Sequence, residues 1–118
     1  MNNYPRVLII EDTKPLALAY EAYLSKEPYQ VDLAFDGAQA SFLVKQTRYD
    51  CILLDLHLPD IDGSELMKQF QESDIDTPII AMTAFGSVDI AVELLRSGAV
   101  DFLEKPLQCY KISYHAKK

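Results

Sequence analysis

Short apolar runs alternate with amphipathic stretches along the whole chain. A continuous apolar run is typical of a strand covered on both faces of a sheet, whereas apolar residues three or four apart indicate a helix with one buried face. The pattern predicts strands over 6–11, 31–35, 49–55, 78–84 and 99–105, and helices over 38–47, 64–72 and 87–97. A further helix is expected between Thr13 and Pro28.

The helical spacing also predicts which side chains face the core. In the first helix one mostly apolar face is predicted, which consists of Leu16, Tyr20, Tyr23, Leu24 and Glu27. In the fourth helix the residues at helical spacing are Val88, Ala91, Val92 and Leu95. Gly98 is expected to end the fourth helix, because glycine readily adopts the left-handed conformation at a helix C-terminus. The tail 107–118 has few apolar residues at helical spacing. We therefore expect a fifth helix there to be atypical or incomplete.

Repeated strand–helix units predict a parallel sheet with helices on both faces. The chain has 118 residues and no linker or repeat, so one α/β domain is expected to fill it from residue 1 to residue 118. The net charge of −7 argues against direct binding of nucleic acid or of an anionic membrane by this domain. No apolar run approaches the roughly 18 residues of a membrane span. A Cys51–Cys109 disulfide is one arrangement, but free thiols in a reducing cytoplasm are favoured.

Polar residues gather where the predicted strands end. The first strand ends in Glu11-Asp12, the third in Asp55, the fourth in Thr83 and the fifth in Lys105. The carboxyl ends of parallel strands share one edge of a sheet, where ligands bind in open α/β folds. A single acid at such a position is more often a helix cap or a solvated turn residue. The combined pattern favours a functional site.

The expected charge at this edge indicates what the site binds. Three clustered carboxylates repel one another, and a hard divalent cation with oxygen ligands, such as Mg²⁺, would compensate them together with Lys105. A site balanced in this way can accept a phosphoryl group, because the cation and the ammonium neutralise its oxygens and Thr83 can hydrogen-bond one of them. A carboxylate beside the metal is then a plausible nucleophile towards phosphorus.

These motifs, taken together over about 7–106, resemble the receiver domains of bacterial two-component response regulators. The resemblance implies a single-domain flavodoxin-like (CheY-like) fold with strand order 2-1-3-4-5. It also implies that Asp55 is the phosphoacceptor and that the Mg²⁺ ligands are Glu11, Asp12, Asp55 and the backbone carbonyl of His57. Lys105 and Thr83 would contact the phosphoryl group, and Thr83 and Phe102 would be the switch residues. The structural positions that it implies are Pro59 and Gly63 in the loop after Asp55 and a cis peptide at Lys105-Pro106. Glu11 stands where the family more often has aspartate. The His57 side chain is interpreted as an exposed loop residue.

The resemblance further implies a cytoplasmic signalling switch that catalyses only its own phosphorylation and dephosphorylation. The phosphodonor would be a histidine kinase or a phosphotransfer protein. The stretch 82–106 resembles receivers of NtrC/LuxO-like transcription activators, which implies an ATPase and DNA-binding output domain outside this chain. Phosphorylation would change the face formed by the fourth helix, fifth strand and fifth helix, and a homodimer is one partner arrangement.

Other functions make different chemical demands. A flavodoxin-type FMN carrier needs a hydroxyl- and glycine-rich phosphate loop, whereas the first loop here is EDTKP, whose acids repel phosphate. A metal-dependent phosphatase with an aspartyl nucleophile typically has a second aspartate two residues after the first, where this chain has His57. The main alternative is an unphosphorylated protein-docking module.

Overall fold

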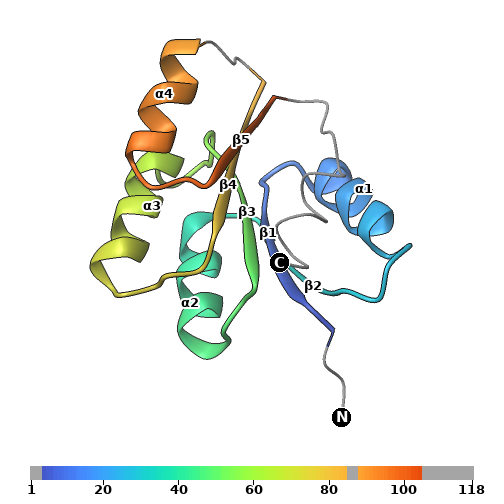
Figure 1. Cartoon of the computed structure of the whole chain (residues 1–118). Coiled ribbons are helices and arrows are strands. Elements are labelled where there is room, and N and C mark those ends of the chain that lie inside the picture. The colour runs from blue at the N-terminus through green and yellow to red at the C-terminus, as the bar shows by residue number, and fades with distance from the viewer. Residues whose placement is uncertain (1–3, 85–87, 105–118) are drawn as a thin grey trace.

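The computed structural model describes residues 4–84 and 88–104. The elements in chain order are β1 (Arg6–Ile10), α1 (Lys14–Leu24), β2 (Gln30–Ala34), α2 (Gly37–Gln46), β3 (Cys51–Asp55), α3 (Gly63–Glu72), β4 (Ile79–Thr83), α4 (Val88–Arg96) and β5 (Asp101–Glu104). The strands form one parallel sheet in the order β2-β1-β3-β4-β5. Helix α1 covers one face, and α2, α3 and α4 cover the other (Figure 1). The predicted fold class and strand order are confirmed, while the predicted fifth helix lies outside the described residues.

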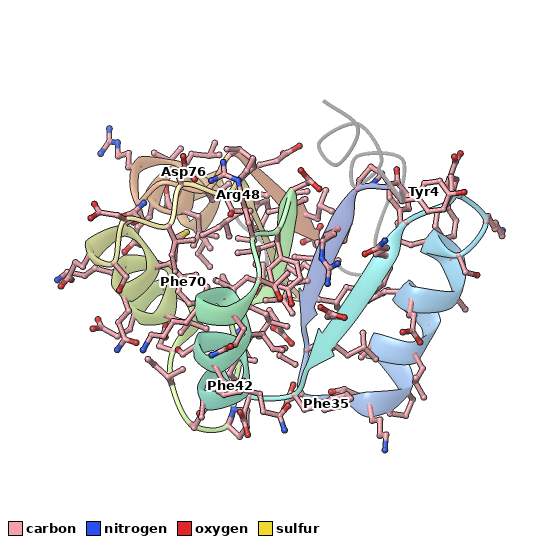
Figure 2. All side chains as sticks on the ribbon, turned by 90° about the horizontal axis from the view of Figure 1, so that it is seen from below. Tyr4, Phe35, Phe42, Arg48, Phe70 and Asp76 are labelled. Carbon is pink, nitrogen blue, oxygen red and sulfur yellow. The ribbon has the colours of Figure 1, made fainter. Side chains whose placement is uncertain are left out.

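Two apolar layers form because alternate residues of a strand point to opposite faces of the sheet. Leu8 and Ile10 of β1 pack with the layer under α2, α3 and α4, where Phe70 of α3 is also buried (Figure 2). Val7 and Ile9 of the same strand pack with Tyr20 and Leu24 of α1 in the other layer. The three central strands are buried on both faces, which explains their continuous apolar runs.

Helix α1 ends at Leu24, before the proline that was expected to stop it. The hydroxyl of Ser25 donates a hydrogen bond of 2.6 Å to the carbonyl oxygen of Ala22, and such side-chain bonds compete with continuation of a helix. At the other end of the chain, β5 begins at Asp101, later than predicted. Gly98 has a φ of +113°, so its predicted role at the end of α4 is confirmed.

The predicted inward faces of two helices were wrong in part. In α1 the buried stripe is Ala17, Tyr20 and Leu24, while Leu16 and Tyr23 are exposed because they lie beside this stripe. Among the side chains of α4 that the structure describes, Leu94 is buried, whereas Val92 and Leu95 are exposed by 42% and 48%. The side chain of Val88 lies outside the described part. Helix α4 carries apolar residues on more than one face, so spacing alone did not distinguish the buried stripe from the exposed one.

Cys51 is a fully buried free thiol at the start of β3, as predicted. Burial raises the pKa of this thiol to about 12 from an ordinary value of 9.0. Cys109 lies outside the described residues. Within the described part of the chain, no helix is long and apolar enough to cross a membrane.

The raised pKa of Cys51 predicts a loss of stability in alkali. The unfolded chain releases the thiol proton near its ordinary pKa, but the folded chain keeps it to higher pH, so stability falls as pH rises above about 9. Between about pH 8 and about pH 10, the free energy of unfolding of the wild type should fall by about 1 kcal/mol more than that of Cys51→Ala. Urea denaturation at the two pH values measures this difference, and equal falls in both proteins would contradict the burial of an ionisable thiol.

Candidate functional site

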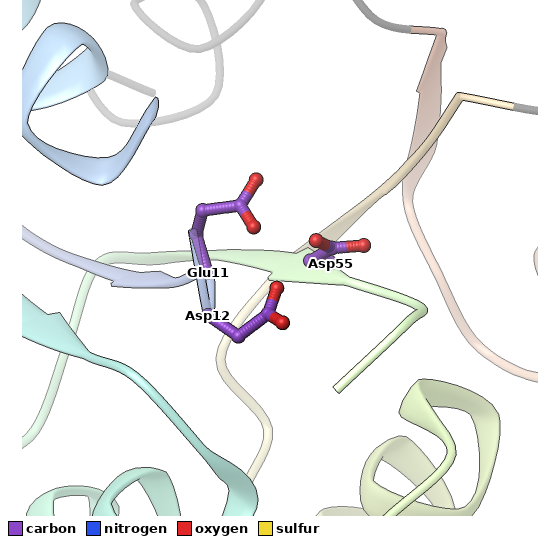
Figure 3. Close-up of side chains that lie close together, drawn as sticks. All are labelled: Glu11, Asp12 and Asp55. Carbon is purple, nitrogen blue, oxygen red and sulfur yellow. The ribbon is translucent and has the colours of Figure 1, made fainter. Parts of the chain in front are cut away.

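The register of the sheet brings the acidic residues of β1 and β3 together. Ile10 of β1 pairs with Leu54 of β3. The residues that follow them, Glu11 and Asp55, therefore lie side by side. Asp12 follows Glu11 at the same edge. The three carboxylates offer oxygen atoms that all lie within 4.8 Å of one another (Figure 3). The predicted convergence of these side chains is thus present in the structure.

Two of the three carboxylates are removed from solvent. Glu11 is fully buried and Asp55 is 2% exposed, whereas Asp12 is exposed. The Oε2 atom of Glu11 accepts a hydrogen bond of 3.2 Å from the backbone N–H of Thr13. The Oδ1 atom of Asp55 accepts one of 3.0 Å from the backbone N–H of His57. These bonds orient both carboxylates, and the second fixes the start of the loop after β3.

The donor set of this site fits a hard divalent cation. Two unit charges 4.8 Å apart repel by roughly 3 kcal/mol at an effective dielectric constant of 20. Carboxylate oxygens are the ligands that Mg²⁺ takes in proteins, and one or two of them suffice because the ion keeps several waters. The cluster of Glu11, Asp12 and Asp55 can therefore hold a metal ion that relieves their repulsion.

Thr83 stands at the end of β4, one residue beyond the partner of Asp55. Asp55 pairs with Met82, and Thr83 is 1% exposed. The Oγ1 atom of Thr83 lies 3.5 Å from Nε2 of His57, at the outer limit of a hydrogen bond. His57 is exposed, as expected, but its contact with Thr83 was not predicted. Strand and loop residues that are 26 positions apart meet here, a contact that no local sequence pattern indicates.

The loop after β3 returns tightly to the start of α3. The backbone N–H of Gly63 donates to the carbonyl oxygen of Leu56 at 2.9 Å. A Cβ atom at Gly63 would lie 2.6 Å from the Cα atom of Leu56, so only glycine fits this approach without a shift of the backbone. Pro59 is exposed near the tip of this loop. Asp60, beside it, accepts a hydrogen bond from the N–H of Gly37 in α2, a contact that no local sequence pattern indicates.

The remaining predicted site residues belong to β5 and the chain beyond it. Phe102 is half-buried in β5 and packs against the layer under α2, α3 and α4. Thr83 pairs with Glu104, the residue before Lys105. Lys105 and Pro106, including the expected cis peptide, lie outside the described residues.

Comparison with known proteins gives the same family at the levels of sequence and structure. Residues 7–117 match the response regulator receiver domain family. The regulatory protein LuxO of Vibrio cholerae serotype O1 is 38% identical over 104 residues, which cover 88% of this chain and 23% of LuxO. The chain therefore spans about a quarter of the length of that relative.

Solved receiver structures superpose closely on this chain. The receiver domain of a putative LuxO repressor protein from Vibrio parahaemolyticus has a TM-score of 0.91 and 39% identity, and the match covers 97% of this chain and 91% of that one. The receiver domain of the sensor histidine kinase PA1611 from Pseudomonas aeruginosa has a TM-score of 0.84 and 31% identity, with 97% and 95% covered. The latter structure has a magnesium ion coordinated in its active-site cleft.

The crowding of carboxylates predicts that removing one charge stabilises the metal-free fold. Asp55→Asn keeps an oxygen that can accept the His57 N–H but removes the repulsion with Glu11 and Asp12. In EDTA its free energy of unfolding should exceed that of the wild type by about 1–2 kcal/mol. Glu93→Gln, the same charge change on exposed α4, serves as the control and should change stability by less than about 0.5 kcal/mol. Urea denaturation measures both, and an Asp55→Asn variant no more stable than the wild type would contradict the electrostatic account.

Proposed function

Because the chain belongs to the response regulator receiver domain family, we propose that it is a phosphorylation-dependent signalling switch with Asp55 as its phosphoryl acceptor. The observation that carries this proposal is the cluster of Glu11, Asp12 and Asp55 at the carboxyl edge of the sheet. Asp55 lies at the centre of that edge, on a strand with neighbours on both sides. The proposed phosphodonor is a histidine kinase or a phosphotransfer protein, and the proposed compartment is the cytoplasm.

The proposed reaction is an in-line displacement at phosphorus. A carboxylate oxygen of Asp55 attacks the phosphorus atom of a phosphohistidine on the donor protein. A P–O bond forms as the P–N bond breaks, and the released imidazole nitrogen takes a proton from solvent. The product is an acyl phosphate on Asp55. The chain modifies itself in this reaction and later loses the phosphoryl group to water, so it is not a turnover enzyme.

The residues around Asp55 are proposed to hold the phosphoryl group in two ways, through a bound metal ion and through direct contact. Glu11, Asp12, Asp55 and the backbone carbonyl of His57 are the proposed ligands of Mg²⁺, which supplies positive charge to the phosphoryl oxygens when bound. The support for this assignment is the donor chemistry of the cluster and the magnesium ion in the PA1611 receiver. Lys105 is proposed to contact the phosphoryl group as a second source of positive charge.

The proposed switch couples Thr83 to the face formed by α4, β5 and the expected fifth helix. Once Asp55 is phosphorylated, the Thr83 hydroxyl donates to a phosphoryl oxygen and leaves His57, and Phe102 moves inward. A bound phosphoryl group can shift the equilibrium only through such differential contacts with two conformers. The exposed Val92 and Leu95 of α4 lie on an element whose surface would then change.

The output of the switch is proposed to lie beyond these residues. LuxO, ZraR and DltR, which are regulatory proteins with regions similar to this chain, are all longer than the part it matches. We propose a transcription-regulating output with an ATPase and a DNA-binding domain, as in LuxO-like activators. A homodimer of receivers is a further proposed partner arrangement.

Mass spectrometry of the intact protein tests the proposed acceptor. After incubation with acetyl phosphate and Mg²⁺, the wild type should gain one phosphoryl group, and it should gain none in EDTA. Asp55→Ala should gain none under either condition, whereas Glu93→Gln should match the wild type. A phosphoryl adduct on Asp55→Ala would contradict the assignment of Asp55. No adduct on a folded, Mg²⁺-binding wild type would favour the alternative of an unphosphorylated docking module.

A further inference from the structure

The loop between β3 and α3 carries the His57 carbonyl, and both of its ends are held in place. At its start the Leu56 N–H donates to the carbonyl oxygen of Met82 in β4 at 3.1 Å. At its end the Asp62 carboxylate accepts from the N–H of Ser64 at 2.8 Å and caps α3. These bonds fix where the loop leaves the sheet and where it enters α3. His57 also forms an isolated antiparallel bridge with Asp62 inside the loop. Between these two residues, Asp60 and Ile61 contact a different element.

Asp60, in the middle of the loop, is bonded to the first turn of α2. Its Oδ1 atom accepts from the N–H of Gly37 at 2.8 Å, and its Oδ2 atom accepts from the N–H of Ala38 at 3.0 Å. The first N–H groups of a helix have no partner within the helix, and a carboxylate is a favourable acceptor for them. The hydrogen bond from Gly37, above all, holds the pKa of Asp60 below its usual range. Asp60 thus joins two segments more than 20 residues apart in the sequence.

Packing reinforces the same junction. Ile61 is half-buried, and a Cβ atom at Gly37 would overlap its Cγ2 methyl group. That Cβ atom would also lie 3.2 Å from Oδ1 of Asp60. The absence of a side chain at Gly37 therefore lets the loop rest directly on the backbone of α2. Two consecutive loop residues contact one point on this helix, one through hydrogen bonds and the other through an apolar contact.

Helix α2 has a cap of its own that makes no use of the loop. The Oδ1 atom of Asp36 accepts from the N–H of Gln39 at 2.7 Å. Asp36 and Asp60 are both acidic caps of α2, but only Asp60 belongs to the loop. The start of α2 follows β2, whose last residue, Ala34, accepts from the N–H of Glu11 at 3.0 Å. The bonds of Asp60 therefore connect the loop after β3 with the side of the site that carries Glu11.

We propose that Asp60 is a positioning residue for the acidic edge: its two hydrogen bonds to α2 hold the loop so that the His57 carbonyl stays within reach of a cation bound by Glu11, Asp12 and Asp55. This inference rests on the proposed function in treating that carbonyl as a metal ligand. Asp60 itself touches neither the metal nor the phosphoryl group. It acts through the loop, as outer partners of metal ligands commonly do.

The test compares Asp60→Ala and Asp60→Asn with Asp36→Ala. The control Asp36→Ala also removes one negative charge and one cap of α2. In the wild type, however, the Asp36 carboxylate accepts from Gln39 of α2 and not from the loop. Calorimetric titration measures the dissociation constant of Mg²⁺, and amide hydrogen exchange of residues 57–61 in EDTA reports on the loop without metal. Thermal unfolding followed by circular dichroism establishes that each variant is folded.

Asp60→Ala should raise the dissociation constant of Mg²⁺ by about tenfold and accelerate exchange in the loop. Asp60→Asn retains one oxygen acceptor and should fall between Asp60→Ala and the wild type. Asp36→Ala should lower the thermal midpoint but leave the Mg²⁺ affinity and the loop exchange close to those of the wild type. An Asp60→Ala variant with wild-type affinity would overturn the proposal, and so would an equal loss of affinity in Asp36→Ala.

Phosphorylation of the wild type by acetyl phosphate distinguishes failure of this inference from failure of the proposed function. A wild type that accepts no phosphoryl group contradicts the proposed function. If the wild type is phosphorylated but Asp60→Ala has the same Mg²⁺ affinity and the same loop exchange as the wild type, only the positioning role of Asp60 is contradicted.

Discussion

Repulsion among carboxylates at the end of an apolar sheet is the constraint on which the site depends. Glu11 and Asp55 are almost completely buried, and with Asp12 they offer oxygens within 4.8 Å of one another. The strands behind them contain only apolar side chains at the register positions that bring them together. Such an arrangement costs stability unless positive charge enters. The cluster can therefore hold a cation, and the proposed phosphoryl chemistry would use that cation.

Hydrogen bonds hold the loop of this edge at fixed positions, whereas the contact between Thr83 and His57 is long. The loop after β3 is bonded to β4, to α3 and, through Asp60, to α2. By contrast, Thr83 and His57 meet at 3.5 Å, a distance at which a hydrogen bond contributes little. A switch needs both features, since a rigid site gives a phosphoryl group defined contacts and a weak bond is easily exchanged for a stronger one. Asp60 is thus proposed to position the site, and Thr83 is the residue proposed to move.

Much of the fold and of the acidic edge could be predicted from the sequence because both follow from local patterns. Apolar runs located the strands, and parallel pairing brought Glu11, Asp12 and Asp55 together. The buried face of α4 was predicted wrongly because the helix is apolar on more than one side, and only tertiary packing selects Leu94 over Leu95. The bonds of Asp60 to α2 were not predicted, because they join segments more than 20 residues apart that no periodicity relates. The roles of Lys105 and Pro106 remain predictions.

The most direct test of this account is a Mg²⁺ titration of the metal-free wild type followed by the backbone amide resonances. Saturable binding of one ion is expected, with the largest shifts at residues 11–13 and 55–58, where the carboxylates and the loop meet. Sodium at matched ionic strength should not reproduce these shifts. An absence of saturable binding, or shifts spread evenly over the exposed acidic residues of the surface, would contradict the claim that this edge is built around a cation.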